Sequence, residues 1–236
     1  MKLYAYCLCA DLETLATPVS GVSGAAVRIL KIDDTSVVVS DCDTVPATHE
    51  NMLVHAAVVR SVFEQTTTVP FRFGTLANEQ QLRSFIAGHK AAIAKKLAHL
   101  GDRVEMDLKI VWQHQTSRPD QPEEAAGPGT AFLRQKRREL LGDDQAVAHR
   151  KELSSLLRED LGDLIKDEEM NLQLSETTVL GKVFHLVETL EIQDYRDRIS
   201  EIPGKRPELA VEVSGPWPPY SFANIDLEFG SQFGVS

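Results

Sequence analysis

Long apolar runs are missing from this sequence, which excludes a membrane-spanning helix. No stretch approaches the ~20 consecutive apolar residues that such a helix requires. The N-terminus, Met1-Lys2-Leu3-Tyr4, enters a strand pattern directly and lacks a signal-peptide layout. Cysteine is scarce as well: three residues are too few, and odd in number, for a disulfide framework. We therefore expect a cytosolic protein without membrane contact, in which Cys7 and Cys9 are reduced and share one face of a strand.

The sequence also lacks the motifs of catalysis and metal binding. There is no Gly-x-Gly-x-x-Gly segment, no phosphate loop and no Gly-x-Ser-x-Gly. The seven histidines are scattered, and no two lie four residues apart beside a carboxylate. We expect a protein that is not an enzyme and that holds no cofactor or metal.

An excess of basic residues is missing too. The formal net charge is −10. Residues 1–119 carry 12 basic and 12 acidic side chains, whereas residues 120–236 carry 13 and 23. The negative excess therefore lies in the second half of the chain. A nucleic-acid partner is not expected, because it would require a basic face.

What the sequence contains is typical of a soluble globular protein, with 42% hydrophobic and 25% charged residues. A chain of 236 residues fits two small domains. In the first region, strands are expected at 2–9, 26–32, 36–40 and 104–112, and helices at 49–65 and from Asn78 to Leu100. The first helix is expected to bury Met52, Ala56, Val59 and Phe63, and the second Leu82, Ile86, His89, Ile93, Leu97 and Leu100. This order favours an α+β sandwich with the helices on one face of the sheet.

The second region repeats this mixture of helices and strands. Helical segments are expected from Thr130 to about Ile165, then strands at 170–174 and 179–187, a helix near 192–202 and a strand at 209–214. A segment rich in proline, glycine and glutamate separates the two regions. The fold class is therefore α+β, with domains at 1–115 and 130–222, a connection at 116–129 and an irregular tail at 223–236.

One segment, Val69-Pro70-Phe71-Arg72-Phe73-Gly74-Thr75, combines an extended Pro-anchored start with a turn. Pro70 pushes the residue before it into extended geometry, and Gly74 permits a positive φ. Arg72 is expected to be an ion-pair or carbonyl-clamping residue that fixes the joint between strand, turn and helix. The alternative is a partner contact, because arginine is favoured at interfaces.

A second segment, Gly215-Pro216-Trp217-Pro218-Pro219-Tyr220-Ser221-Phe222, follows the last expected strand. Three prolines within four positions exclude a helix or a central strand and make the backbone stiff. Trp217 and Tyr220 therefore belong either to a corner that closes a domain by aromatic packing, or to an exposed platform for a partner.

These two segments resemble the hallmarks of the gas vesicle accessory family GvpF/GvpL, in the order in which that family carries them. Gly129-Thr130-Ala131-Phe132-Leu133-Arg134 is similar to a third hallmark, Gly-x-x-Tyr/Phe-Leu-x-x-Arg, although its closing arginine falls at Arg137 or Arg138. Tyr4-Ala5-Tyr6 fits the family's opening. The resemblance extends from about residue 3 to about residue 222.

The resemblance implies a minor gas vesicle accessory protein with a ferredoxin-like variant as its first domain. Its implied partners are the small hydrophobic shell protein GvpA, on the gas-facing side, and other gas vesicle accessory proteins. It would reside in the cytoplasm before assembly and in the gas vesicle afterwards, and would help the shell protein to assemble or keep it from aggregating. The alternative is a ferredoxin-like regulatory or small-ligand-binding module. The candidate partner-binding or motif residues are Arg72, Phe73, Gly74, Thr75, Trp217, Pro218, Pro219, Tyr220, Phe229 and Phe233.

Overall fold

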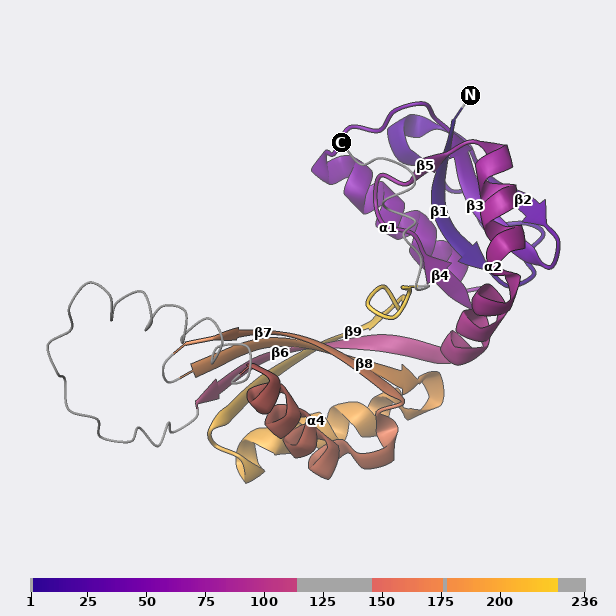
Figure 1. Ribbon diagram of the computed structural model, residues 1–236. Helices are drawn as coiled ribbons and strands as arrows, with labels where there is room; N and C mark the ends of the chain where they lie inside the picture. Colours follow the sequence, from indigo (N-terminus) through magenta and orange to yellow (C-terminus); the bar gives the residue numbers. More distant parts are fainter. Residues whose placement is uncertain (1, 114–145, 176–177, 225–236) are drawn as a thin grey trace, which may run out of the picture. The chain divides into compact units, whose positions relative to one another are not determined.

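The computed structural model describes residues 2–113, 146–175 and 178–224 (Figure 1). The chain divides into two compact units, one comprising residues up to Glu105 and the described residues from Pro216 onward, and the other Met106–Gly215. Each unit contains its own sheet and its own helices, so the predicted α+β class is confirmed. No helix among the described residues is both long and apolar enough to cross a membrane.

The sheet of the first unit is built around β1, which is buried along its whole length. The strands are β1 (Leu3–Cys9), β2 (Val27–Ile32), β3 (Thr35–Asp41), β4 (Thr68–Pro70) and β5 (Leu76–Ala77). Their order is β2-β3-β1-β4, and β5 pairs with β1 on the same side as β4. β2 and β3 form the predicted antiparallel hairpin, and Asp33 takes a positive φ of 51° in its two-residue turn.

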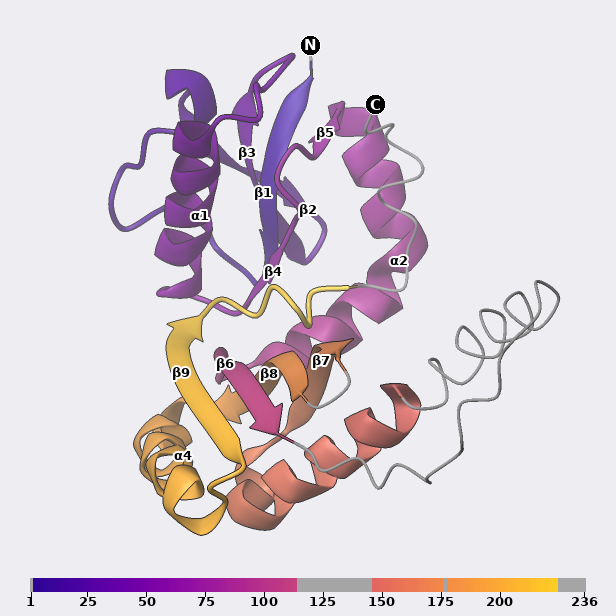
Figure 2. The ribbon, with the colours of Figure 1, turned by 90° about the vertical axis from the view of Figure 1, so that its left-hand side faces the viewer.

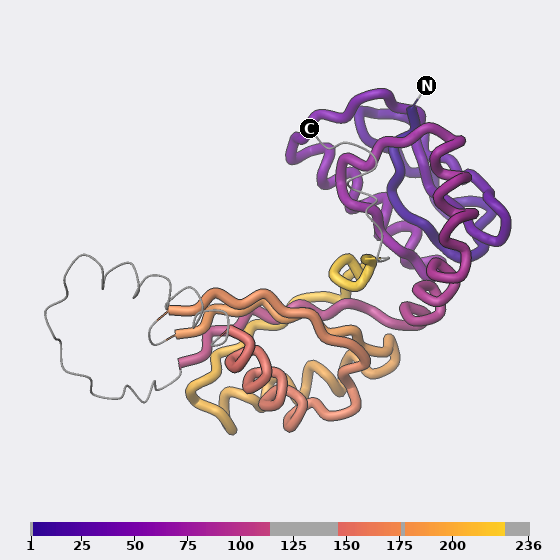
Figure 3. The backbone as a smooth tube through the Cα atoms, viewed as in Figure 1, coloured from indigo at the N-terminus to yellow at the C-terminus, as the bar shows by residue number. Residues whose placement is uncertain are grey.

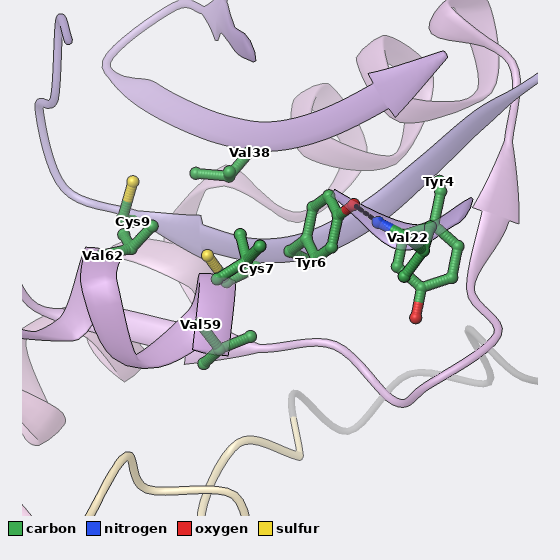
Figure 4. Close-up of a cluster of buried hydrophobic side chains, with 9 residues drawn as sticks. Tyr4, Tyr6, Cys7, Cys9, Val22, Val38, Val59 and Val62 are labelled. Atoms are coloured by element: carbon green, nitrogen blue, oxygen red, sulfur yellow. Dashed lines mark hydrogen bonds between the residues drawn. The ribbon is translucent and has the colours of Figure 1, made fainter. Parts of the chain in front are cut away.

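A bulge in β1 decides which of its side chains share a face. The pairing with β3 shifts register between Ala5 and Cys7. Tyr4, Tyr6, Cys7 and Cys9 consequently lie in one core cluster (Figure 4), although strict alternation would separate Tyr6 from Cys7. The prediction that Cys7 and Cys9 share a face is confirmed, and both are free and buried.

Helix α1 (His49–Phe63) packs on this face of the sheet, but the residues that it buries differ from those predicted. Its buried residues are Asn51, His55, Val58, Val59 and Val62. The prediction that Met52 and Ala56 are buried is wrong, because both are exposed. The apolar residues of α1 form more than one possible stripe, and the choice between them depends on the sheet.

Helix α2 (Glu79–Leu100) begins with the predicted capping box, in which Asn78 and Gln81 each accept from the other's backbone N–H. It buries Leu82, Phe85, Ile86, Ile93 and Leu100, close to the predicted stripe. Figure 2 shows α1 and α2 on opposite sides of the sheet rather than on one side. Val37 and Val39, which point away from the α1 cluster, are fully buried and so require this second cover.

The second unit has a four-stranded sheet with helices on one side (Figure 3). Its elements are β6 (Arg103–Gln113), a helix at 146–161, η2 (Gly162–Leu164), β7 (Asp167–Leu174), β8 (Thr178–Glu188), η3 (Thr189–Glu191), α4 (Ile192–Lys205) and β9 (Leu209–Trp217). The described elements follow the order βαββαβ, and the sheet order is β7-β8-β6-β9. This is the ferredoxin-like arrangement. The first unit, where a ferredoxin-like variant was expected, departs from this order, because three strands precede its first α-helix.

β6 shows the alternation that the sequence indicated, with one exception. Val104, Met106, Leu108, Ile110 and Trp112 are all buried. Glu105 was expected on the wet face, but it is also buried, and its carboxylate is satisfied there by hydrogen bonds from Ser221.

The units differ from the predicted domains at 1–115 and 130–222, because the division falls within β6 and β9. The segment from Pro216 to Phe222 groups with the first unit, not with the strand that leads into it. The predicted connection at 116–129, the motif starting at Gly129 and the tail residues Phe229 and Phe233 lie outside the described residues.

Candidate functional site

The segment Val69–Thr75 forms an interruption in the edge of the first sheet. Pro70 pairs with Cys7 at the end of β4, and Phe71 N–H donates to the Tyr6 carbonyl at 2.9 Å. Pairing resumes where Ala5 N–H donates to the Thr75 carbonyl at 3.0 Å. The three residues between Phe71 and Thr75 therefore project from the strand edge as a turn.

This turn is closed by Thr75, whose N–H and hydroxyl both donate to the Arg72 carbonyl, at 3.3 and 2.7 Å. Gly74 has a φ of 89°, a conformation that side chains disfavour, so the predicted need for glycine is confirmed. Gly74 N–H donates to the Tyr4 hydroxyl at 3.2 Å. The turn is thus bound to β1 by a side chain as well as by the backbone.

Tyr4 and His55 hold the turn in place through contacts with Gly74 and Phe73. The Tyr4 hydroxyl lies 2.8 Å from His55 Nδ1, and both side chains are buried. The Phe73 ring makes edge contacts with both, with centroid distances of 6.1 Å to Tyr4 and 5.9 Å to His55. We call this pair the Tyr4–His55 clamp.

The electrostatics of the clamp fix its hydrogen-bond directions. Burial lowers the pKa of His55 to about 4, an effect that the backbone of Phe71 partly offsets, so its ring is neutral near pH 7. Burial also raises the pKa of Tyr4, which therefore keeps its proton. Tyr4 accepts from Gly74 N–H, so its own proton is available for a hydrogen bond to His55 Nδ1.

Arg72 does not clamp the joint, and that part of the prediction is wrong. Its side chain is exposed, and it makes no hydrogen bond or ion pair within the described residues. The clamping role belongs to Tyr4 and His55 instead. The turn presents Arg72 to solvent, so its role as a partner contact stays a prediction.

The Pro216–Phe222 segment, which we call the corner, is anchored by its proline rings and its last aromatic side chain. Pro218, Pro219 and Phe222 are buried. Glu105 accepts from Ser221 N–H at 2.6 Å and from its hydroxyl at 3.0 Å. The corner is therefore packed structure at its centre and at its end.

Trp217 and Tyr220 remain 38% exposed on this anchored corner. The Arg60 guanidinium lies over the Trp217 ring, 5.0 Å from its centroid, and so joins the corner to α1. The corner is therefore packed through Pro218, Pro219 and Phe222, whereas a role of Trp217 and Tyr220 as a platform for a partner stays a prediction.

The two motifs lie in the same unit although about 145 residues separate them in sequence. Tyr220 is near enough to Tyr4 to contribute to the raised pKa of that residue. Burial is the main cause of the raised pKa of Tyr220 itself, and Cys7 adds to it. The structure thus brings the turn, the clamp and the corner together around β1 and α1.

A second buried network, in the second unit, was not found by sequence reasoning. His185 Nδ1 lies 2.7 Å from the Tyr195 hydroxyl, and its Nε2 lies 3.0 Å from Glu168. Ser154 donates to the other oxygen of that carboxylate. Burial lowers the pKa of His185, so its ring is neutral and donates from Nε2. The network is closed to solvent at His185 and joins β7 and β8 to both helices, which is a structural role.

The described part of the chain contains no group of three or more histidine, cysteine, aspartate or glutamate side chains able to hold a metal ion.

The model of the family described as "Gas vesicle synthesis protein GvpL/GvpF" matches residues 2–224. This chain belongs to the GvpL/GvpF family. It is therefore a gas vesicle accessory protein, and its family is one of structural and accessory proteins rather than known enzymes.

Gas vesicle proteins named F and gas vesicle proteins named L are both similar to nearly the whole chain. Gas vesicle protein F1 of Halobacterium salinarum is 27% identical over 99% of this chain and 98% of its own length. Gas vesicle protein L1 of the same organism is 23% identical over 93% of this chain and 90% of its own length.

Two crystal structures share the fold. GvpF from Anabaena sp. PCC7120 gives a TM-score of 0.71 at 17% identity, covering 94% of this chain and 96% of its own. GvpF from Microcystis aeruginosa gives a TM-score of 0.72 at 16% identity, covering 94% and 99%. The fold of this family member is thus the fold of known GvpF proteins.

Proposed function

We propose that this GvpL/GvpF protein associates with the small hydrophobic shell protein GvpA, on the gas-facing side of the vesicle, and helps it to assemble or keeps it from aggregating. A shell that excludes water from its inner face is built from monomers with large apolar surfaces, and such surfaces aggregate unless they are covered. Other gas vesicle accessory proteins are further partners in this proposal. The protein would be cytoplasmic before assembly and part of the gas vesicle afterwards.

The observation that supports this function best is that exposed side chains stand on segments whose backbone is anchored by buried residues. The Tyr4–His55 clamp fixes the turn that presents Arg72. Buried prolines and Glu105 fix the corner that presents Trp217 and Tyr220. A backbone that is held in place before binding loses less entropy when the side chains it carries meet a partner. Phe229 and Phe233, in the apolar tail, would add contacts in this proposal.

The proposal is tested by co-expressing the affinity-tagged full chain with GvpA and measuring how much GvpA stays soluble and is retained. We expect retention by the wild-type chain, and GvpA in the pellet when the chain is left out. An absence of retention, with GvpA equally soluble without this protein, would overturn the proposal.

The ferredoxin-like order of the second unit favours one competing function, a small-ligand-binding module. A thermal-shift screen of the full chain against a panel of metabolites separates the two. Stabilisation by one metabolite, together with no retention of GvpA, would favour the binding module.

A further inference from the structure

The outward side of α1 carries apolar residues that its own unit leaves uncovered. Leu53 is 57% exposed and Met52 45% exposed, and Ala56 and Ala57 on the next turn are exposed too. Arg60 lies seven residues beyond Leu53, two helical turns along nearly the same line. Because Arg60 lies over Trp217, this line continues onto the corner.

We call this region the α1–Trp217 surface, defined by Met52, Leu53, Ala56, Ala57, Arg60 and Trp217. It lies within the first unit. It was not visible in the sequence, because Met52 and Ala56 were expected to face the core.

Arg60 gives this surface its chemical preference. Its guanidinium has no carboxylate partner among the described residues, whereas Arg28, Arg83, Arg158 and Arg206 each pair with one. A guanidinium that lies over an indole can still donate its N–H groups to a carboxylate, because the cation–π contact uses none of its hydrogen bonds. The surface therefore combines an oriented cation with an apolar strip.

We propose that the α1–Trp217 surface binds a short amphipathic segment of the partner that carries both apolar side chains and a carboxylate. The apolar side chains would cover Leu53 and Trp217, and the carboxylate would pair with Arg60. Leu53 and Arg60 are separated by about 10 Å along the helix axis, from a rise of ~1.5 Å per residue. The partner segment therefore places its carboxylate about 10 Å from one of its apolar side chains. This inference rests on the proposed function, and GvpA is the partner that it commits to.

The test compares two variants of the surface with two matched controls in the full chain. Leu53→Asp places a charge on the apolar strip, and Arg60→Glu reverses the cation. Leu190→Asp and Arg150→Glu make the same changes in the second unit, at a residue that is 96% exposed and at an exposed arginine. The readout is the amount of co-expressed GvpA retained by the tagged chain, with thermal unfolding of each variant as a check of folding.

We expect Leu53→Asp and Arg60→Glu each to reduce retention about tenfold or more, and the controls to stay within about twofold of wild type. Arg60→Gln should also lessen the decrease of retention with added salt, because it removes the charge pair. Leu53→Ala, a milder change at an exposed position, serves if Leu53→Asp unfolds the chain, and it should reduce retention several-fold.

Retention that is equal in wild type and in both surface variants would overturn this inference and leave the proposed function intact. No retention by the wild type would overturn the proposed function and this inference with it. Equal losses in the surface variants and in the controls would also overturn the inference. A second copy of the chain is the other possible occupant: concentration-dependent dimers in sedimentation, lost in Leu53→Asp, would overturn the choice of GvpA.

Discussion

The hydroxyl of Tyr4 lies 2.8 Å from Nδ1 of His55 and accepts the N–H of Gly74 at 3.2 Å. One buried hydroxyl therefore connects β1, α1 and the turn that presents Arg72. The turn is held by side chains that lie far from it in the sequence, and Arg72 itself remains exposed.

Tyr4→Phe should reduce the free energy of unfolding by about 1–3 kcal/mol, because it leaves the Gly74 N–H and His55 Nδ1 without their partner. Urea denaturation measures the change. Tyr220→Phe is the matched control: its hydroxyl makes no hydrogen bond within the described residues, so we expect a change within about 0.5 kcal/mol. Equal effects of the two substitutions would contradict the clamp.

The clamp also predicts a dependence of stability on pH. The pKa of His55 is lowered from 6.5 to about 4, so between these values the unfolded chain binds more protons than the folded chain. Stability contributed by His55 is therefore complete above about pH 6.5 and is lost as the pH falls towards 4. The full effect is on the order of 3 kcal/mol.

His55→Gln should flatten this part of the stability curve relative to wild type, as measured by urea denaturation from pH 4 to pH 7. His49→Gln, at an exposed histidine of the same helix, should leave the wild-type slope in place. Some slope should remain in His55→Gln, because burial also lowers the pKa of His185. A slope as steep as that of the wild type would contradict the assignment to His55.

Arg72→Ala should change the free energy of unfolding by no more than about 0.5 kcal/mol, because the side chain is exposed and unpaired within the described residues. The same variant should reduce the retention of co-expressed GvpA if Arg72 is a contact residue. Arg150→Ala provides the control for loss of an exposed arginine. A loss of stability above about 1 kcal/mol would mean that Arg72 does fix the joint between strand, turn and helix, a role that the structure assigns to Tyr4 and His55.

Truncation of Phe222 should lower the free energy of unfolding more than truncation of Trp217. Phe222→Ala should cost about 3–5 kcal/mol, as for other large buried side chains, because Phe222 is 4% exposed. Trp217→Ala should cost less, about 1–3 kcal/mol, because 38% of the Trp217 surface is already exposed to solvent. Thermal or urea unfolding of both variants tests the difference, and the reverse order would mean that Trp217 is the anchor.

The sequence by itself determined the features that depend on neighbouring residues. The β2–β3 hairpin, the capping box of α2 and the alternation of β6 arise from local turn chemistry, capping and periodicity, which are readable along the chain. The two proline-anchored motifs, in order, were specific enough to indicate the family. Gly74 was also predictable, because few residues other than glycine adopt its φ.

Only the tertiary structure decided which of these features meet. The bulge in β1 set the face of Tyr6, and the sheet selected the buried stripe of α1, thereby leaving Met52 and Leu53 exposed. The clamp spans 51 residues from Tyr4 to His55, and the anchor of the corner spans 116 from Glu105 to Ser221. Such contacts have no periodicity or local spacing to reveal them, because they form only when distant segments pack against one another.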